Sequence, residues 1–339
     1  MKKFLIILGI LAALVVAAVY YFRNAQVAVG YFNGNKKVIY IEKSLSKEEL
    51  IAALMKDSII QNPEELELTM RLKRFESAKL GRYVIAKGMS SEKLINMLRS
   101  GDQTPVLVSV DGVRTIYQLA AKLDKQLQFD STAFMQTLLD KNLLDRYGLN
   151  EMNVGTLIFP NSYEFFWTVS CEDFLSRMEK EYTKFWTAER KTKAQKLGLS
   201  VAEVGVLASI VKGETVQFEE AGKIARLYLN RLEKNQKLQA DPTVIFANQL
   251  KGVKRLRGSQ YLENESPYNT YKHVGLPPGP IFFTEAKYID AVLNAPMHRY
   301  IFMCAQPNAT GFHDFTSSDT EHMKNAAAYR RWANENNIH

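Results

Sequence analysis

The first 22 residues limit how the rest of the chain can fold more than any other stretch does. Residues 1–3 are Met-Lys-Lys, and residues 4–22 then run for 19 residues without a charged side chain. As a helix, this run is about 28 Å long, which is close to the hydrocarbon thickness of a bilayer. It ends in the bulky sequence Val-Tyr-Tyr-Phe rather than in the small residues of a cleavage site. We therefore expect an uncleaved transmembrane anchor over 4–22, with a cleaved signal peptide as the alternative.

The anchor also predicts on which side of the membrane the rest of the chain lies. Lys2 and Lys3 favour a cytoplasmic N-terminus, which puts residues 23–339 of this single-pass protein outside the cytoplasmic (inner) membrane. With 46% hydrophobic and 24% charged residues, the chain of 339 residues has an ordinary globular composition, and its length suggests two or three domains. The net charge of +8 suits an anionic partner, but the basic residues are scattered, so we expect no nucleic-acid binding.

The chain gives no sign of a metal site or of an organic cofactor. Its five histidines and two cysteines have no close ligand spacing, and Cys171 and Cys304 lie so far apart that the sequence leaves their pairing open. The GxGxxG, Walker A, GxSxG and HExxH motifs are also absent from the sequence. We expect neither a metal nor a cofactor.

Two regions of different size follow the anchor. Residues 23–36 are mostly polar and indicate a tether, and residues 37–101 have the pattern of a small α+β unit. Ser46 and Glu49 have the spacing of a capping box, and Gly101 is placed to end a helix. The expected elements of this small unit are a strand at 37–41, helices at 47–56 and 64–76, a strand at 81–86 and a helix at 92–99.

The longer region from residue 105 reads as a second, mainly helical α+β unit. An aromatic-rich segment at 157–167 is interpreted as core, with a sugar-stacking platform as the alternative, and Ser200 is expected to cap a helix. The loops at 266–271 and 275–280, stiffened by proline, suit the wall of a cleft. The expected elements are strands at 106–110, 300–303 and 312–315, and helices at 115–123, 131–144, 171–197, 200–214, 219–235, 241 onward, 286–293 and 318–334.

One carboxylate stands where acid chemistry is possible. Val204, Leu207 and Val211 share one helical face, and the same face reaches Glu214 three residues later. Because burying a charged carboxylate is costly, the pKa of Glu214 should be raised, as a general acid near neutral pH requires. Gly213 beside it would allow close approach of a ligand. The alternative is that the helix ends at Gly213 and Glu214 points into water.

Three further residues have more than one reading. Asn230 and Arg231 continue an apolar row and are expected to point inward, with a solvated arginine as the alternative. Asp241 precedes Pro242, a pattern typical of an N-cap, so a structural role suffices for it.

Six short motifs occur in the order found in the YceG-like family of endolytic murein transglycosylases, which this chain resembles. The aromatic loop at 157–163 and the small unit at 37–101 also resemble that family's aromatic element and its LysM-like subdomain. The chain departs from the pattern at Lys212, where an acid is usual, and at Asn161, where an aspartate is usual. The six motifs lie at 207–215, 230–232, 239–244, 268–271, 275–279 and 313–315.

The resemblance implies an α+β fold with an N-terminal transmembrane helix, a small LysM-like α+β subdomain and a larger α+β catalytic domain. The implied division is a cytoplasmic start at 1–3, an anchor at 4–22, a tether at 23–36, the LysM-like subdomain at 37–104 and the YceG-like catalytic domain at 105–339. The implied partners are peptidoglycan glycan strands, the membrane and cell-wall synthases.

The resemblance also implies lytic cleavage between MurNAc and GlcNAc in nascent strands, with Glu214 as acid and then base. With Lys212 in place of the first acid, Glu214 is the acid that remains. Two alternatives stay open: a muramidase that uses Glu219, Glu220 or Asp241 as a second acid, and a non-catalytic glycan-binding scaffold. The residues expected to bind substrate are Thr215, Asn230, Arg231, Gln239, Asp241, Tyr268, Asn269, Thr270 and His313.

Overall fold

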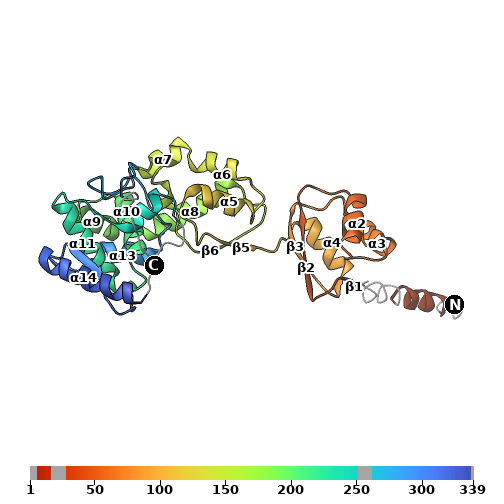
Figure 1. Cartoon of the computed structure of the whole chain (residues 1–339). Helices are drawn as coiled ribbons and strands as arrows, with labels where there is room; N and C mark the ends of the chain where they lie inside the picture. Colours follow the sequence, from red (N-terminus) through yellow and green to blue (C-terminus); the bar gives the residue numbers. More distant parts are fainter. Residues whose placement is uncertain (1–5, 17–27, 251–261, 337–339) are drawn as a thin grey trace. The chain divides into compact units, whose positions relative to one another are not determined.

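The computed structural model describes residues 6–16, 28–250 and 262–336, and the chain divides into two compact units (Figure 1). The N-terminal unit comprises Met1–Leu107 and Glu164–Val169. The C-terminal unit comprises Val108–Tyr163 and Ser170–His339. A short return of the chain at 164–169 therefore belongs to the smaller unit, although most of its sequence neighbours belong to the larger one.

An apolar helix, Ile6–Val16, occupies part of the expected anchor, and its described side chains are exposed. In the described ranges, no single helix is both long and apolar enough to cross a bilayer. Two helices joined by a bend, Ala188–Lys196 and Val201–Glu214, are together long and apolar enough, by length and composition alone. The rest of the predicted anchor, at 4–5 and 17–22, and the first part of the predicted tether, at 23–27, lie outside the described residues.

Residues 28–101 of the N-terminal unit, all of them described, form two small antiparallel sheets and three helices, and the expected elements are confirmed with small shifts. The helix expected at 64–76 ends early, because the chain turns at Arg74 (φ 48°) to bury Phe75 completely. Gly101 ends the last helix with φ 78°, a left-handed conformation that favours glycine. The elements are β1 (Ala28–Val29), β2 (Lys36–Ile41), α2 (Lys47–Lys56), α3 (Pro63–Leu72), β3 (Gly81–Ala86), β4 (Met89–Ser90) and α4 (Ser91–Ser100), with β1 paired to β4 and β2 to β3.

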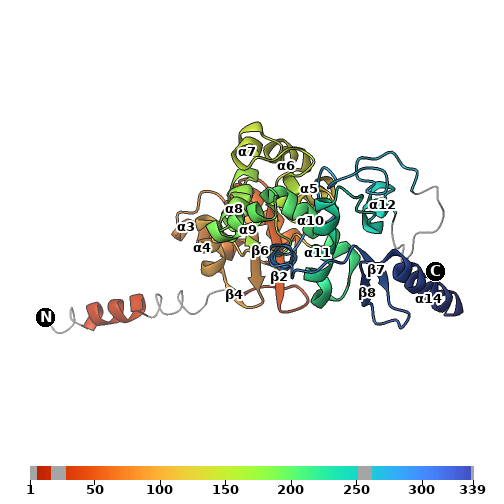
Figure 2. The same cartoon turned by 90° about the vertical axis from the view of Figure 1, so that its left-hand side faces the viewer.

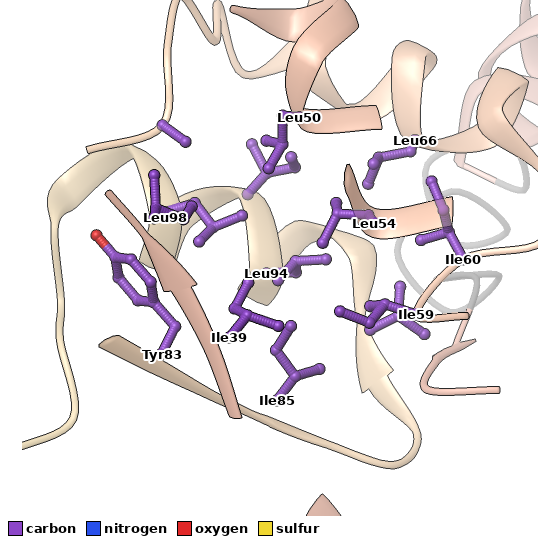
Figure 3. Close-up of a cluster of buried hydrophobic side chains, with 14 of the residues drawn as sticks. Ile39, Leu50, Leu54, Ile59, Ile60, Leu66, Tyr83, Ile85, Leu94 and Leu98 are labelled. Carbon is purple, nitrogen blue, oxygen red and sulfur yellow. The ribbon is translucent and has the colours of Figure 1, made fainter. Parts of the chain in front are cut away.

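The core of the N-terminal unit is an apolar cluster between the β2–β3 pair and the helices (Figure 3). Strand side chains alternate between two faces, and Ile39 lies opposite Tyr83 in the register, so both contribute to the same buried face. The helices bring Leu50, Leu54 and Leu94 against this face from the other side. The capping box expected at Ser46 and Glu49 is present and begins α2.

The C-terminal unit is mainly helical and carries short strand pairs. The pair β5 and β6 lies where the chain passes between the two units, and β7 pairs with β8 in antiparallel fashion. The elements are β5 (Val106–Ser109), α5 (Ile116–Asp124), α6 (Ser131–Leu138), α7 (Lys141–Tyr147), η1 (Val154–Leu157), β6 (Ser162–Phe165), α8 (Cys171–Phe185), α9 (Ala188–Lys196), α10 (Val201–Glu214), η2 (Phe218–Glu220), α11 (Ala221–Glu233), α12 (Asp241–Ala247), α13 (Ala286–Leu293), β7 (Phe302–Ala305), β8 (His313–Thr316) and α14 (Asp319–Glu335).

Two helices expected to be continuous are each broken in the middle, so those two predictions are wrong in extent. Asp140 interrupts the first, and its side chain accepts hydrogen bonds from two backbone N–H groups at the start of α7. Thr187 interrupts the second by capping α9, directly after the buried Trp186. In both cases a capping side chain inside the predicted helix starts a new one.

Helix α10 is the centre of the C-terminal unit and carries the predicted acid at its end. It packs against α9, α11, α12 and α13. Figures 1 and 2 both show it near α9 and α11. Ser200 and Glu203 form a capping box at its start, as expected for Ser200. Ala202 and all residues from Val204 to Val211 are buried, so the helix is surrounded by protein rather than buried along one stripe.

Most of the aromatic segment at 157–167 is core, as expected. Phe159, Tyr163 and Phe165 are buried, whereas Phe166 is exposed, and the Tyr163 hydroxyl donates to the Phe159 carbonyl oxygen over 3.0 Å. Both cysteines are free thiols, with Cys171 buried and Cys304 partly buried.

Candidate active site

Glu214 is the last residue of α10 and is half-buried. Its Oε1 accepts a hydrogen bond from the Tyr228 hydroxyl over 2.5 Å. Burial raises the pKa of Glu214 from 4.5 to about 8; the Tyr228 hydrogen bond and the Arg231 charge oppose this rise, and the Asp241 charge adds to it. The helix does not stop at Gly213, so the alternative of an acid in open water is wrong. The carboxyl group holds its proton at neutral pH.

Gly213 serves packing rather than the approach of a ligand. A Cβ at this position would lie 2.7 Å from the Pro242 Cβ and 3.0 Å from the Phe282 ring. Glycine therefore lets the last turn of α10 touch the start of α12 and the loop before α13. The expectation that Gly213 opens space for a ligand is wrong, because protein side chains already fill that space.

Thr215 stabilises the turn that follows the acid. Its buried hydroxyl accepts from the Gln217 backbone N–H over 2.9 Å and lies 3.2 Å from the Gln217 carbonyl oxygen. The hydroxyl that donates a hydrogen bond to Glu214 is that of Tyr228, which is 2% exposed.

Two tyrosines of the site, Tyr228 and Tyr271, were not among the residues predicted from the sequence. The Tyr271 hydroxyl donates to Asp241 Oδ1 over 2.6 Å, in the same way that Tyr228 donates to Glu214. A buried tyrosine usually finds a partner for its hydroxyl, so Tyr228 on an apolar stripe was a usable signal. Tyr271 is the last residue of the family motif at 268–271.

Asp241 does not cap its helix, so its N-cap interpretation is wrong. Helix α12 begins at Asp241 itself, and Ala240 occupies the N-cap position without a side-chain hydrogen bond. The carboxylate is instead exposed and bound by Tyr271, and its charge acts on Glu214. Asp241 is thus the second acid of the neighbourhood.

Arg231 lies partly buried and points inward, as expected. Its Nε donates to the Ile301 carbonyl oxygen over 2.7 Å and its Nη1 to the Leu238 carbonyl oxygen over 2.6 Å. Burial lowers the pKa of Arg231, while the charges of Tyr228, Tyr271 and Glu214 act to raise it. Arg231 therefore brings positive charge next to the Glu214 carboxyl group.

Asn230 is fully engaged inside the protein. It is 6% exposed; its Nδ2 donates to the carbonyl oxygens of His298 and Tyr300, and its Oδ1 accepts from Arg226 Nε. This amide ties α11 to the chain leading into β7 rather than facing a ligand.

The side chains of Asn269 and Thr270 are likewise engaged in hydrogen bonds within the protein. Both are buried; Asn269 Nδ2 donates to two carbonyl oxygens, and its Oδ1 accepts from the Tyr271 backbone N–H. Thr270 Oγ1 accepts from the Ala240 backbone N–H and shares a hydrogen bond with Thr243. These contacts place Tyr271 and Asp241 opposite each other.

Gln239 and Tyr268 remain more open. Gln239 is exposed and adopts a left-handed backbone (φ 51°), with its N–H donating to the Thr270 carbonyl oxygen. Tyr268 is half-buried beside Phe246, with 4.8 Å between ring centroids. A Cβ at Gly279 would lie 2.8 Å from the Tyr268 hydroxyl oxygen and 1.8 Å from the Met152 carbonyl oxygen. Position 279 therefore admits only glycine.

His313 belongs to a second cluster, centred on the buried Glu220. The two oxygens of Glu220 accept from the His313 backbone N–H, and His313 Nδ1 lies 2.9 Å from Glu220 Oε2. This cluster joins β8 to η2, just after the loop that follows Glu214. Glu220 is therefore engaged with His313, while Glu219 is exposed.

Lys212 turns away from the acid. Its Nζ donates to the Phe283 carbonyl oxygen over 2.8 Å and pairs with Glu285 Oε2 at 2.6 Å. Residues two apart on a helix face different directions, which explains why Lys212 leaves Glu214 to Tyr228.

Comparison with known proteins supplies the family. A model of the YceG-like family matches residues 39–328. The chain belongs to the YceG-like family. The resemblance expected from the six motifs is thereby confirmed, and the match covers parts of both units.

Named relatives and one solved structure agree with this assignment. The endolytic murein transglycosylase of Bacillus subtilis strain 168 is 27% identical over 313 residues, which cover 88% of this chain and 86% of that protein. That of Streptococcus pneumoniae serotype 2 strain D39 is 23% identical, and the match spans 88% of this chain but 59% of that protein. The crystal structure of a YceG-like protein from Listeria monocytogenes has the same fold, with a TM-score of 0.56, 24% identity, and coverage of 86% of this chain and 98% of that one.

Proposed function

We propose that this chain is a membrane-anchored endolytic transglycosylase that cleaves MurNAc–GlcNAc bonds within nascent peptidoglycan strands and leaves 1,6-anhydroMurNAc ends. The observation that carries the proposal is the half-buried Glu214, whose pKa burial raises to about 8 at the end of a central helix. Two relatives named endolytic murein transglycosylase support the choice of substrate and reaction.

The lytic reaction requires one carboxyl group in two successive roles. Protonated Glu214 gives its proton to the glycosidic oxygen as the bond to the anomeric carbon breaks. The C6 hydroxyl of the same MurNAc then attacks that carbon, and its proton passes to the Glu214 carboxylate. Atoms and charges balance without a water molecule, and Glu214 returns to its starting form. A pKa of about 8 suits both steps, because the group is protonated at rest and basic after the first transfer.

The residues around Glu214 divide into those that face substrate and those that hold the site. Arg231, Gln239, Asp241 and Tyr268 form the first group, in which Asp241 stabilises the positive charge that develops on the sugar ring. Hydrogen bonds within the protein occupy the side chains of the second group, which position the loops. This second group comprises Thr215, Asn230, Asn269, Thr270 and His313.

The proposal places the reaction beside the membrane. Residues 4–22 anchor the chain with its N-terminus in the cytoplasm, and the predicted tether at 23–36 is shortened, because Val29 and Phe32 belong to the core of the N-terminal unit. The 19-residue uncharged run and the apolar helix Ile6–Val16 support the anchor. Residues 37–104 then act as a LysM-like glycan-binding subdomain, and residues 105–339 as the catalytic domain. Cell-wall synthases that produce the strands are the proposed protein partners.

The test is mass spectrometry of products from un-crosslinked glycan strands incubated with the full-length protein in detergent. Internal fragments that end in 1,6-anhydroMurNAc are expected with the wild type and with Glu219→Gln, which neutralises an exposed acid on the following loop. They should be missing with Glu214→Gln. Reducing ends would contradict the lytic mechanism and point to hydrolysis with Asp241 as the second acid. Absence of cleavage by folded wild type would contradict enzymatic activity and favour a glycan-binding scaffold.

A further inference from the structure

The contact between Tyr228 and Glu214 suggests a division of labour within one carboxyl group. Resting on the proposed function, we propose that Tyr228 is a positioning residue that reserves Oε1 of Glu214 as an acceptor and thereby leaves Oε2 as the oxygen that gives and takes the proton.

The geometry supports this division. A phenol has one hydrogen to donate, and Tyr228 donates it to Glu214 Oε1 over 2.5 Å. Within the described residues, Oε2 accepts no hydrogen bond from another side chain or from the backbone. The carbonyl oxygen of a neutral carboxyl group is its better acceptor, so the acceptor role of Oε1 favours the proton of neutral Glu214 on Oε2. Only this oxygen is left to face a glycosidic oxygen or a sugar hydroxyl.

Both partners of this hydrogen bond are held by packing. Tyr228 is 2% exposed on α11, which packs against α10 and α13. The residue before Glu214 is Gly213, clamped against Pro242 and Phe282. The buried phenol therefore presents its hydroxyl to the Glu214 carboxyl group from a fixed direction.

The hydrogen bond also changes strength during the reaction. A donor binds a charged carboxylate more strongly than a neutral carboxyl group, so Tyr228 stabilises Glu214 after it has given up its proton. Burial raises the pKa of Tyr228 well above 10, so the phenol keeps its own proton throughout. The other charged or titratable groups that act on Glu214 are Arg231 on α11, Asp241 on α12 and Tyr271, whose hydroxyl is bound to Asp241.

The decisive variant is Tyr228→Phe, which removes the donor and keeps the ring. The matched control is Tyr83→Phe in the N-terminal unit, where an equally buried tyrosine donates to a backbone carbonyl oxygen. We expect Tyr228→Phe to lower kcat about tenfold with little change in KM, because the acid loses its fixed orientation. Losing a donor to the charged form should raise the pKa of Glu214, so the alkaline limb of kcat/KM should move to higher pH by about one unit.

The measurements are pH profiles of kcat/KM for full-length wild type and both variants on glycan strands, from pH 5 to pH 10. A profile and a kcat of Tyr228→Phe that superimpose on those of the wild type would overturn the proposal, as would an equal change in Tyr83→Phe.

A second readout separates this inference from the proposed function. The carboxyl resonances of glutamate labelled with ¹³C at Cδ are titrated, and the Glu214 signal is assigned by its loss in Glu214→Gln. A higher pKa of Glu214 in Tyr228→Phe than in the wild type supports the inference even if the wild type fails to cleave strands. Equal pKa values in the two proteins contradict it even if the enzyme is active.

Discussion

The interiors of the two units differ in kind. In the N-terminal unit, the described core is an apolar cluster, and Ser91 is the polar or charged side chain that is buried there. The C-terminal unit contains the other buried polar and charged side chains of the described residues. These are Ser209, Thr215, Glu220, Arg226, Asn230, Thr243, Asn269, Thr270, Thr284 and Thr316.

This difference shows what each interior contributes. An apolar core stabilises through burial and depends little on the direction of any contact. Buried polar groups are costly unless they are bonded, and each bond fixes a direction. In the C-terminal unit, the bonds of Asn230, Asn269 and Thr270 hold the segments that carry Arg231, Tyr271 and Asp241. The apolar cluster of the N-terminal unit therefore contributes mainly stability, and the buried polar groups of the C-terminal unit mainly hold the site residues in position.

The largest expected effect breaks the chemistry and spares both interiors. Glu214→Gln should lower kcat by at least about 10³-fold, because the amide can neither give nor take the proton. The fold should persist at neutral pH, since the amide replaces a neutral carboxyl group of the same shape. Initial rates of 1,6-anhydro end formation, with circular dichroism as a control for folding, measure both points. Residual activity within tenfold of the wild type would assign the acid to another residue.

The apolar interior is probed by Leu54→Ala. Leu54 is 1% exposed, and truncating such a side chain costs about 2–5 kcal/mol in the free energy of unfolding. We expect hydrogen exchange followed by mass spectrometry to show faster exchange across α2, α3 and α4, with rates in α10 and α11 unchanged. The kcat on short un-crosslinked strands should stay at the wild-type value. A parallel loss of protection in α10 would contradict the independence of the two interiors.

Protonation of Glu214 makes the stability of the C-terminal unit depend on pH. Folded Glu214 has a pKa of about 8, whereas in the unfolded chain it ionises near 4.5. Between these values the folded state binds more protons, so stability falls as pH rises from about 4.5 to about 8. Glu214→Gln removes this loss. Its Tm should match that of the wild type at pH 4 and exceed it by several degrees at pH 9. An equal difference at both pH values would show that Glu214 is not protonated in the folded protein.

The polar interior is probed by Asn230→Leu, a substitution of similar size. It leaves Arg226 Nε and the carbonyl oxygens of His298 and Tyr300 without their partner, which costs about 1–3 kcal/mol. Unlike Leu54→Ala, this variant should also lower kcat, because α11 carries Tyr228 and Arg231. Chemical denaturation and initial rates are measured on the same preparation. A stability loss with unchanged kcat would separate the buried amides from the positioning of the site.

The smallest effect is expected at Lys212. Its ion pair with Glu285 is partly exposed, so Lys212→Met should cost at most about 1 kcal/mol. Activity should be retained, because Lys212 points to the loop before α13. A loss of kcat above tenfold would show that the cation acts on Glu214 after all.

Local rules were sufficient for much of the fold. Ser46 was identified as a cap from its spacing to Glu49, Ser200 as the cap of its helix, and Gly101 as the end of a helix. They failed at Asp140 and Thr187, where capping residues lie within stretches long enough to be predicted as one helix. A cap competes with helix continuation, and tertiary packing decides between them.

The site was predicted in part. The place of Glu214 on a buried helix face and the inward direction of Arg231 followed from helical periodicity. The apolar face of a helix packs against the core whatever the rest of the fold is. The partners of Asp241, Thr215 and Tyr228 did not follow, since a short polar side chain bonds to whatever the fold brings within reach. The family motifs located these residues correctly in the sequence, but they did not distinguish groups that face a ligand from groups bonded within the protein.

The position of Glu214 at the last residue of α10 has an electrostatic consequence. The aligned peptide dipoles of a helix place a partial negative charge at its C-terminal end, which opposes a carboxylate there. The positive side chain in that turn, Lys212, is occupied by Glu285 and does not offset this field. The backbone of α10 therefore disfavours the charged form of Glu214. Each time Glu214 releases its proton, the helix itself favours the return of one.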